Sequence, residues 1–223
     1  MDAISEWVQA QQRVIDLVGP LTAEQADATV PACPDWTVRD LLSHMVGLDA
    51  DVLDGDEPDD HNEGWTKRQV AARVDRDVPT LIEEWTALTE PLRAWMAENT
   101  TRPLGDVVIH EQDLRGALGV TGAQDTEGLE SLRDQFAGRL GDAVAGLPPL
   151  ALIGDGWTWA SHGQVADAEV AIEASDFDLA RALMSRRSAQ QLRSWTRRGD
   201  VTPYLSAFEL LGSLPDDDLT ETF

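Results

Sequence analysis

Ionisable side chains recur at helical spacing in the segment "GDVVIHEQDLRGALG", residues 105–119. On a helix with about 100° per residue, Asp106, His110 and Asp113 fall on one line, directly beside a line of apolar positions. Asp106 and His110 are four residues apart, so their side chains stack on one face of the helix, one turn from each other. A carboxylate and an imidazole in this arrangement can share one divalent cation.

A second histidine of the same kind lies in an earlier helical segment. We expect His61, in an acidic loop, and His162, in a turn, to face solvent. His44 lies at the edge of an apolar stripe that should face the interior of a helical bundle. The candidate metal ligands are therefore His44, Asp106 and His110.

The spacing also fits a simpler explanation. A histidine beside a core stripe is more often packed in the interior than bound to a metal, and an acid such as Asp106, near a helix start, is favoured by the helix dipole. Spacing alone leaves both interpretations open.

The neighbouring polar residues have candidate roles beside the ligands. Glu111 or Asp113 could accept a hydrogen bond from the ring N–H of a metal-bound histidine, and Asp113 is preferred because it shares the ligand row. Arg115 could pair with Asp113 or bind an acidic substrate, and a structural ion pair explains it equally well. We name Asp113 and Arg115 as candidate catalytic residues.

The elements that must position these residues are helices. Thr37 with Asp40 is typical of a capping box and predicts a helix that begins there and carries His44. The stretch 54–64 is acidic and is expected to be an exposed loop. Amphipathic periodicity predicts further helices at 5–18, 78–96, 103–119 and 129–144. These long helices predict an up-and-down helical bundle.

The pattern changes after Pro149, which leads us to expect two domains. We expect a strand or hairpin arm within 150–160 with a turn at 154–156, a strand with alternating burial within 166–173, and helices at 177–187 and 203–211. The predicted fold class is thus α+β, with a bundle domain at 1–146 and a small α+β domain at 147–223. Arg186 and Arg187, at the end of one predicted helix, either complement its dipole or bind a carboxylate of a substrate or co-substrate. They are our candidate cofactor-binding residues.

Composition excludes several classes of protein. The 223 residues include 41 acidic and 17 basic side chains, a net charge of −24, so nucleic acid and anionic membranes are poor partners. No apolar run approaches the ~20 residues of a membrane helix, and the N-terminus lacks a signal-peptide pattern, so we expect a cytoplasmic protein. Cys33 is the only cysteine, which rules out an internal disulfide and a multi-cysteine metal site.

Two segments carry a family resemblance. "VPACPDWTVRDLLSHMVGLD" (30–49) and "DVVIHEQDLRGALG" (106–119) resemble the signatures of the mycothiol-dependent maleylpyruvate isomerase family, a branch of the DinB-like bundles. The segment 174–200 resembles the small, sterol-carrier-like C-terminal domain of such proteins. The resemblance implies a four-helix bundle with a metal ion, zinc before nickel, iron or manganese, held by His44, His110 and Asp106. The family pattern has Glu where this chain has Asp106, which is one methylene shorter.

The resemblance also implies a reaction. Three protein ligands leave a position open on the metal, where mycothiol, a low-molecular-weight thiol, would lose its proton and add to a small electrophilic substrate. Elimination would then make the protein an isomerase, and release of the adduct would make it a transferase. A metal-dependent hydrolase using the same site, and a non-enzymatic small-molecule or lipid-binding protein, stay open as alternatives. Bundles of this kind are often homodimers.

Overall fold

The computed structural model describes residues 1–58 and 62–220, which form two compact units, residues 1–123 and residues 124–220. The first unit is a helical bundle and the second combines helices with a sheet, so the predicted α+β class is confirmed. No helix within the described residues is both long and apolar enough to cross a bilayer. The predicted exposed position of His61 lies outside the described residues.

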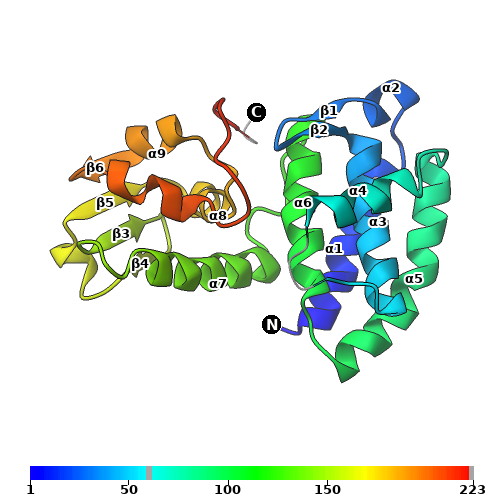
Figure 1. Ribbon diagram of the computed structural model, residues 1–223, viewed down its shortest axis with the longest axis horizontal. Coiled ribbons are helices and arrows are strands. Elements are labelled where there is room, and N and C mark those ends of the chain that lie inside the picture. The colour runs from blue at the N-terminus through cyan, green and yellow to red at the C-terminus, as the bar shows by residue number, and fades with distance from the viewer. Residues whose placement is uncertain (59–61, 221–223) are drawn as a thin grey trace. The chain divides into compact units, whose positions relative to one another are not determined.

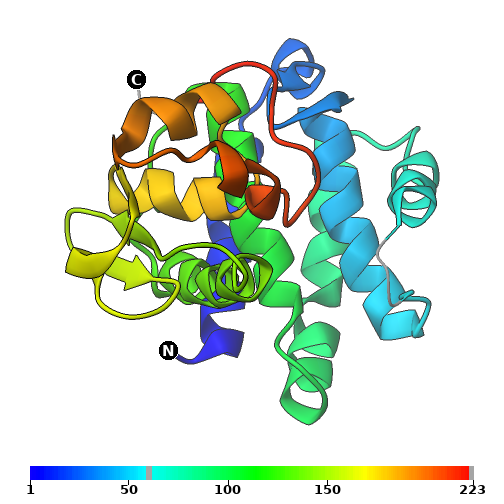
Figure 2. The same cartoon turned by 60° about the vertical axis from the view of Figure 1, so that its left-hand side comes forward.

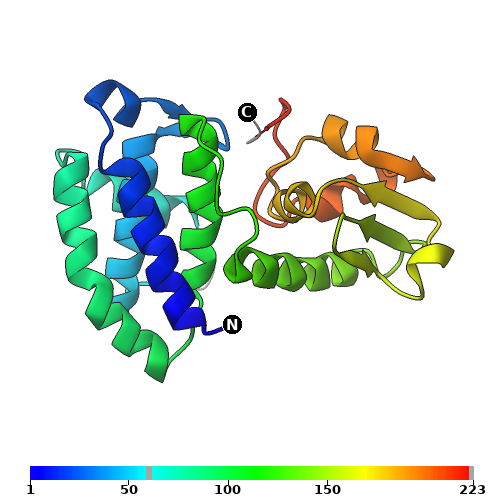
Figure 3. The same ribbon diagram turned by 180° about the vertical axis from the view of Figure 1, so that it is seen from behind.

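Four long helices build the first unit. They are α1 (Ala3–Val18), α3 (Val38–Asp54), α5 (Val78–Glu98) and α6 (Pro103–Leu118). Helix α6 packs between α1 and α3, and α5 closes the ring by packing on both of them (Figures 2 and 3). The apolar interior they enclose contains, among others, Trp7, Val14, Leu41, Leu81 and Leu92, each fully buried.

Helix α3 begins where the sequence predicts. The Thr37 hydroxyl accepts a hydrogen bond from the Asp40 amide, and the Asp40 carboxylate accepts one from the Thr37 amide. This capping box satisfies two backbone donors that would otherwise lack partners at the helix start. It thereby fixes the start of the helix that carries His44.

The direction of the helices shows one departure from a simple up-and-down order. Helices α1 and α6 run one way along the bundle, and α3 and α5 both run the other way (Figures 1 and 3). The connection between α3 and α5 returns the chain to the starting end and contains the short helix α4 (Glu63–Ala71). The acidic stretch 54–64 predicts a loop, and α4 is not predicted from the sequence. Its low apolar content gives little amphipathic signal, although Trp65 and Gln69 are buried.

A small hairpin at one end of the bundle was also not predicted. After the single turn α2 (Ala23–Ala26), strand β1 (Thr29–Val30) pairs antiparallel with β2 (Cys33–Thr37). These strands are too short for a period of two to be recognised. The hairpin leads directly into α3.

The second unit begins earlier than the predicted boundary at residue 146. Helix α7 (Glu127–Ala143) belongs to it because α7 packs on α8 (Asp176–Leu183). The sheet has the order β4-β3-β5-β6, in which β3 is parallel to β5 and the other two pairs are antiparallel. The strands are β3 (Leu150–Ile153), β4 (Thr158–Ala160), β5 (Val170–Glu173) and β6 (Thr196–Arg198). The helical elements η1 (Val165–Asp167), α9 (Ala189–Trp195) and η2 (Thr202–Phe208) complete the unit.

Several predicted elements of this unit need correction. The strand or hairpin arm expected within 150–160 is the antiparallel pair of β3 and β4. The alternating strand expected within 166–173 is shorter, because η1 precedes β5. Val170, Ala171 and Ile172 are all buried, since β5 lies between two other strands and is covered on both faces. Helix α8 ends at Leu183 rather than near residue 187, and the left-handed backbone of Ser185 (φ 58°) follows it. The last predicted helix is the 3₁₀ segment η2.

Candidate metal centre

The three predicted ligands converge inside the bundle. The Nε2 atoms of His44 and His110 lie 3.3 Å and 3.4 Å from the same carboxylate oxygen of Asp106. The two imidazole rings meet edge to face, with centroids 5.2 Å apart. His44 comes from α3 and the other two residues from the adjacent α6, where they are one turn apart. The side chains of all three are at most 16% exposed.

The spacing of these atoms fits a single metal ion. Zinc bound tetrahedrally at about 2.0–2.1 Å places its ligand atoms about 3.3–3.4 Å apart. The two distances from Asp106 to the histidines fall at this spacing, and one ligand atom from each of the three residues lies within 4.8 Å of the others. The donor set of two imidazole nitrogens and one carboxylate oxygen suits zinc and several other divalent transition metals.

The far side of each imidazole is engaged by another polar side chain. His110 Nδ1 lies 2.9 Å from Asp113 Oδ2, and His44 Nδ1 lies 2.7 Å from Gln69 Oε1. An ionised carboxylate and an amide oxygen can only accept, so both Nδ1 atoms carry the hydrogen. The Nε2 lone pairs of both histidines are thereby left for a cation.

The electrostatics of the group favour positive charge at its centre. Burial disfavours the imidazolium of His110, but the carboxylates of Asp106 and Asp113 raise the pKa of His110 to about 9. Burial likewise disfavours the Asp106 carboxylate, yet His110 and His44 hold the pKa of Asp106 well below its usual range. A proton therefore occupies the group at neutral pH, and a divalent cation would compete for the same position.

A further carboxyl group is buried near this site. Asp49, on α3, is 3% exposed and accepts a hydrogen bond from the indole N–H of Trp85 at 2.6 Å. Burial raises the pKa of Asp49 well above its usual value; the Trp85 hydrogen bond opposes this shift, and the charge of Asp106 adds to it. No sequence pattern distinguishes Asp49 from the other acids of this acid-rich chain.

The hairpin contributes two side chains near the histidines. The ring of Trp36 lies 5.0 Å from the ring of His44, and the Cys33 thiol lies 3.8 Å from Asp113 Oδ2. Because β2 leads directly into the first turn of α3, it brings both side chains close to the site. Neither the sequence position of Trp36 before a helix nor that of Cys33 in an expected turn predicts this contact.

Comparison with protein-family models gives one match. The family described as mycothiol maleylpyruvate isomerase N-terminal domain matches residues 7–115. This stretch of the chain is therefore similar to that domain family. Comparisons with curated proteins and with solved structures find no match. The matched range contains His44, Asp106, His110 and Asp113, so the whole candidate site lies within the stretch that is similar to this family.

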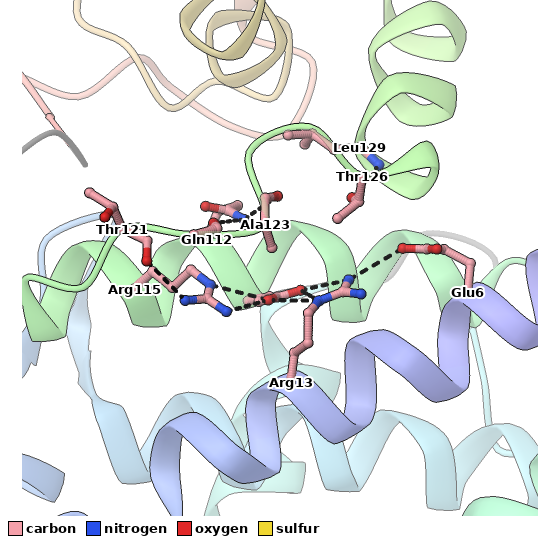
Figure 4. A network of polar contacts seen from close by, with 10 residues as sticks. Glu6, Arg13, Gln112, Arg115, Thr121, Ala123, Thr126 and Leu129 are labelled. Carbon is pink, nitrogen blue, oxygen red and sulfur yellow. Dashed lines mark hydrogen bonds and ion pairs between the residues drawn. The ribbon is translucent and has the colours of Figure 1, made fainter.

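Glu111 and Arg115 of α6 take part in an ion-pair network that includes α1. Glu111 accepts hydrogen bonds from Arg13 of α1 and from Arg115, and Arg13 also pairs with Glu6. Figure 4 shows Arg13 and Arg115 facing each other across this network, with Glu6 beyond Arg13. Arg115 thus pairs with Glu111 rather than with Asp113, and Asp113 is the residue that contacts a histidine. The Glu111 network joins α6 to α1 and has a structural role.

The predicted cofactor-binding arginines belong to the second unit. Arg187 is fully buried and bonds through Nε to Asp178 at 3.0 Å. Arg186, 8% exposed, donates to the backbone oxygen of Met184. Both follow α8 instead of ending it, so the helix-dipole explanation does not apply to them. Their role in binding a cofactor stays a prediction.

Proposed function

We propose that the N-terminal domain binds one divalent metal ion through His44, Asp106 and His110, zinc before nickel, iron or manganese. The observation that supports this is the convergence of two Nε2 atoms on one Asp106 oxygen while both Nδ1–H groups are engaged elsewhere.

We further propose that the protein adds a low-molecular-weight thiol to a small electrophilic substrate, as a transferase or an isomerase. The family name associates such domains with mycothiol, and we take mycothiol as the thiol. When bound, the metal would supply Lewis acidity that lowers the pKa of an incoming thiol.

Each residue of the site has a stated part in this proposal. The ion would be held by His44, His110 and Asp106. Asp113 accepts a hydrogen bond from the Nδ1–H of His110, which orients the ring and increases its basicity. The Trp36 ring lies against His44 and limits access of water on that side. Arg186 and Arg187 are proposed to bind a carboxylate of the thiol or substrate. Arg115 pairs with Glu111, and its part in the reaction stays a prediction.

The experiment combines metal analysis with an activity assay. Protein purified without an affinity tag should contain about one equivalent of metal, and Asp106→Ala should contain little. Addition of mycothiol to an electrophile should fall strongly in His110→Ala and be unaffected in His162→Ala, which removes an exposed histidine. Metal-free wild-type protein, or thiol addition that His110→Ala does not diminish, would refute the proposal. Hydrolysis without added thiol would favour the hydrolase alternative.

A further inference from the structure

The Nδ1 atom of His44 is hydrogen-bonded to a residue of α4, a helix that is not predicted from the sequence. Gln69 of α4 is 2% exposed, its Oε1 lies 2.7 Å from His44 Nδ1, and its Nε2 donates to Asp51 Oδ2 at 2.7 Å. The Asp51 carboxylate can only accept, so the amide nitrogen must face Asp51 and the amide oxygen must face His44. The orientation of the Gln69 amide is therefore determined, and with it the position of the His44 ring hydrogen.

The two histidines differ in the charge of the group behind them. His110 contacts the Asp113 carboxylate directly, whereas a neutral amide separates His44 from the Asp51 carboxylate. A primary amide is suited to this position because it offers an acceptor to the ring N–H and a donor to the carboxylate at the same time. A carboxylate at position 69 would instead face the Asp51 carboxylate across a hydrogen-bond distance.

The packing of α4 on α3 depends on a close approach at the same place. A Cβ added to Gly47 would lie 2.5 Å from Gln69 Cβ and 2.9 Å from an Arg73 nitrogen, so glycine is needed for this contact. Arg73, 8% exposed, donates to the Gln69 backbone oxygen and pairs with Glu84 of α5. Helix α4 is thus held against α3 by the close approach at Gly47 and against α5 by the ion pair of Arg73 with Glu84.

We propose that Gln69 is a positioning residue for the metal site, and that Gln69 and Asp51 together hold His44 as the Nδ1–H form with Nε2 free to bind the ion. This inference rests on the proposed metal function. It adds a role for α4, whose sequence has little apolar periodicity of its own. The proposal also predicts that zinc binding needs one hydrogen-bond donor and one acceptor facing each other at positions 69 and 51, whichever residue supplies which.

Zinc titration of metal-free full-length protein tests the proposal. Gln69→Met, which keeps the volume but removes the acceptor, should weaken zinc binding about 10–100-fold. Gln69→Glu should also weaken it, because two carboxylates then face each other. The Gln69→Glu/Asp51→Asn double variant restores complementarity with unchanged net charge, and its zinc affinity should return to within a few-fold of wild type.

A matched control separates positioning from general damage. Gln11 is 3% exposed, donates to the Trp85 carbonyl oxygen and accepts from the Thr89 hydroxyl. Gln11→Met removes a comparable buried amide from the same bundle and should leave zinc affinity unchanged. Thermal unfolding of all variants shows which of them are folded.

A second readout does not need the metal. The Nδ1–H of His44 should give a protected imidazole N–H signal in nitrogen-edited NMR spectra of the metal-free protein, and Gln69→Met should lose that protection. Wild-type protein that bound no zinc would refute the proposed function, while this signal would still show whether Gln69 positions His44. Equal zinc affinity in Gln69→Met and wild type, or no recovery in the double variant, would overturn the positioning role.

Discussion

At the scale of single residues, the candidate site is a compact set of charges whose protonation depends on its own members. Asp106 lies at hydrogen-bonding range of both imidazoles, and Asp113 contacts the second nitrogen of His110. Because these groups are buried, their mutual interactions are weakly screened by water and ions. Cation binding and pH are therefore coupled at this site.

Zinc binding should release protons near neutral pH. The pKa of His110 is about 9 in the metal-free protein, so the ring is protonated at pH 7 and must lose that proton to become a ligand. We expect release of about one proton per zinc at pH 7 from this histidine, and an apparent zinc affinity that rises with pH up to about 9. Calorimetric titrations in buffers of different ionisation enthalpy measure this number. A pH-independent affinity between pH 6.5 and 9 would contradict the arrangement described here.

The buried Asp49 should make stability depend on pH in the opposite sense from an ordinary ion-paired acid. Burial raises the pKa of Asp49, so the native state binds more protons than the unfolded state. The contribution of Asp49 to stability is therefore present below its unfolded-state pKa, about 4, and declines as pH rises through the native value. Asp49→Asn keeps an acceptor for Trp85 and should gain stability over wild type as pH rises.

Urea unfolding of the metal-free proteins at two pH values checks this expectation. Asp49→Ala serves as the comparison, because it leaves the buried indole N–H of Trp85 without its acceptor. We expect Asp49→Ala to lose about 1–3 kcal/mol. An unchanged stability difference between Asp49→Asn and wild type at pH 5 and pH 8 would argue against a raised pKa.

At the scale of elements, the helices that carry the ligands are fixed by local signals, and the elements that complete the site are fixed by packing. The capping box at Thr37 sets the start of α3, and Pro103 lies in the first turn of α6, where its fixed backbone angle suits a helix. Helix α4 and the β1–β2 hairpin have weak sequence signals of their own. Their positions depend on contacts with α3, such as the close approach at Gly47.

Gly47→Ala should damage both the packing and the site. The added Cβ would meet Gln69 at 2.5 Å, so α4 must shift away from α3, at a cost of about 1–3 kcal/mol. The same shift should lengthen the contact between Gln69 and His44 and weaken zinc binding. Chemical unfolding and zinc titration measure the two effects.

Gly138→Ala provides the control for this substitution. Gly138 lies inside α7 with nothing within 4 Å of an added Cβ, so alanine there should raise helix stability by about 0.5–1 kcal/mol. Zinc affinity should not change. Equal stability changes in the two variants would show that the close approach at Gly47 does not matter.

At the scale of the whole molecule, the chain divides into two units whose boundary differs from the predicted one. The three proposed ligands lie in the first unit, residues 1–123, and the two candidate cofactor-binding arginines lie in the second. The family match, residues 7–115, ends before this boundary. Helix α7 has buried apolar residues that pack within the second unit, including against α8.

Two fragments distinguish the observed boundary from the predicted one. We expect residues 1–123 to fold, remain monodisperse and bind zinc. Residues 1–146 should associate, because α7 would then expose side chains such as Leu132 and Phe136, and each loses about 1.5–3 kcal/mol of burial. Light scattering and zinc titration compare them. A well-behaved 1–146 fragment together with an aggregating 1–123 fragment would favour the predicted boundary.

The sequence by itself determined the parts of this protein that depend on near neighbours in the chain. The helical periods, the capping box at Thr37 and the pairing of Asp106 with His110 all follow from spacings of three or four residues. The placement of His44 near that pair was also predicted, because His44 lies at the edge of the apolar stripe that turns its helix toward the bundle interior. The helical bundle and the α+β class follow from the same patterns.

Only the tertiary structure decided which distant side chains complete the site. Gln69 reaches His44 across 25 residues of sequence, Cys33 reaches Asp113 across 80, and Arg13 binds Glu111 across 98. These contacts depend on how the helices pack. The number of residues between two such side chains does not indicate whether packing brings them together. Arg115 pairs with Glu111 four residues earlier on the same helix, as helical spacing favours, and only the tertiary structure adds Arg13 of α1 to that carboxylate.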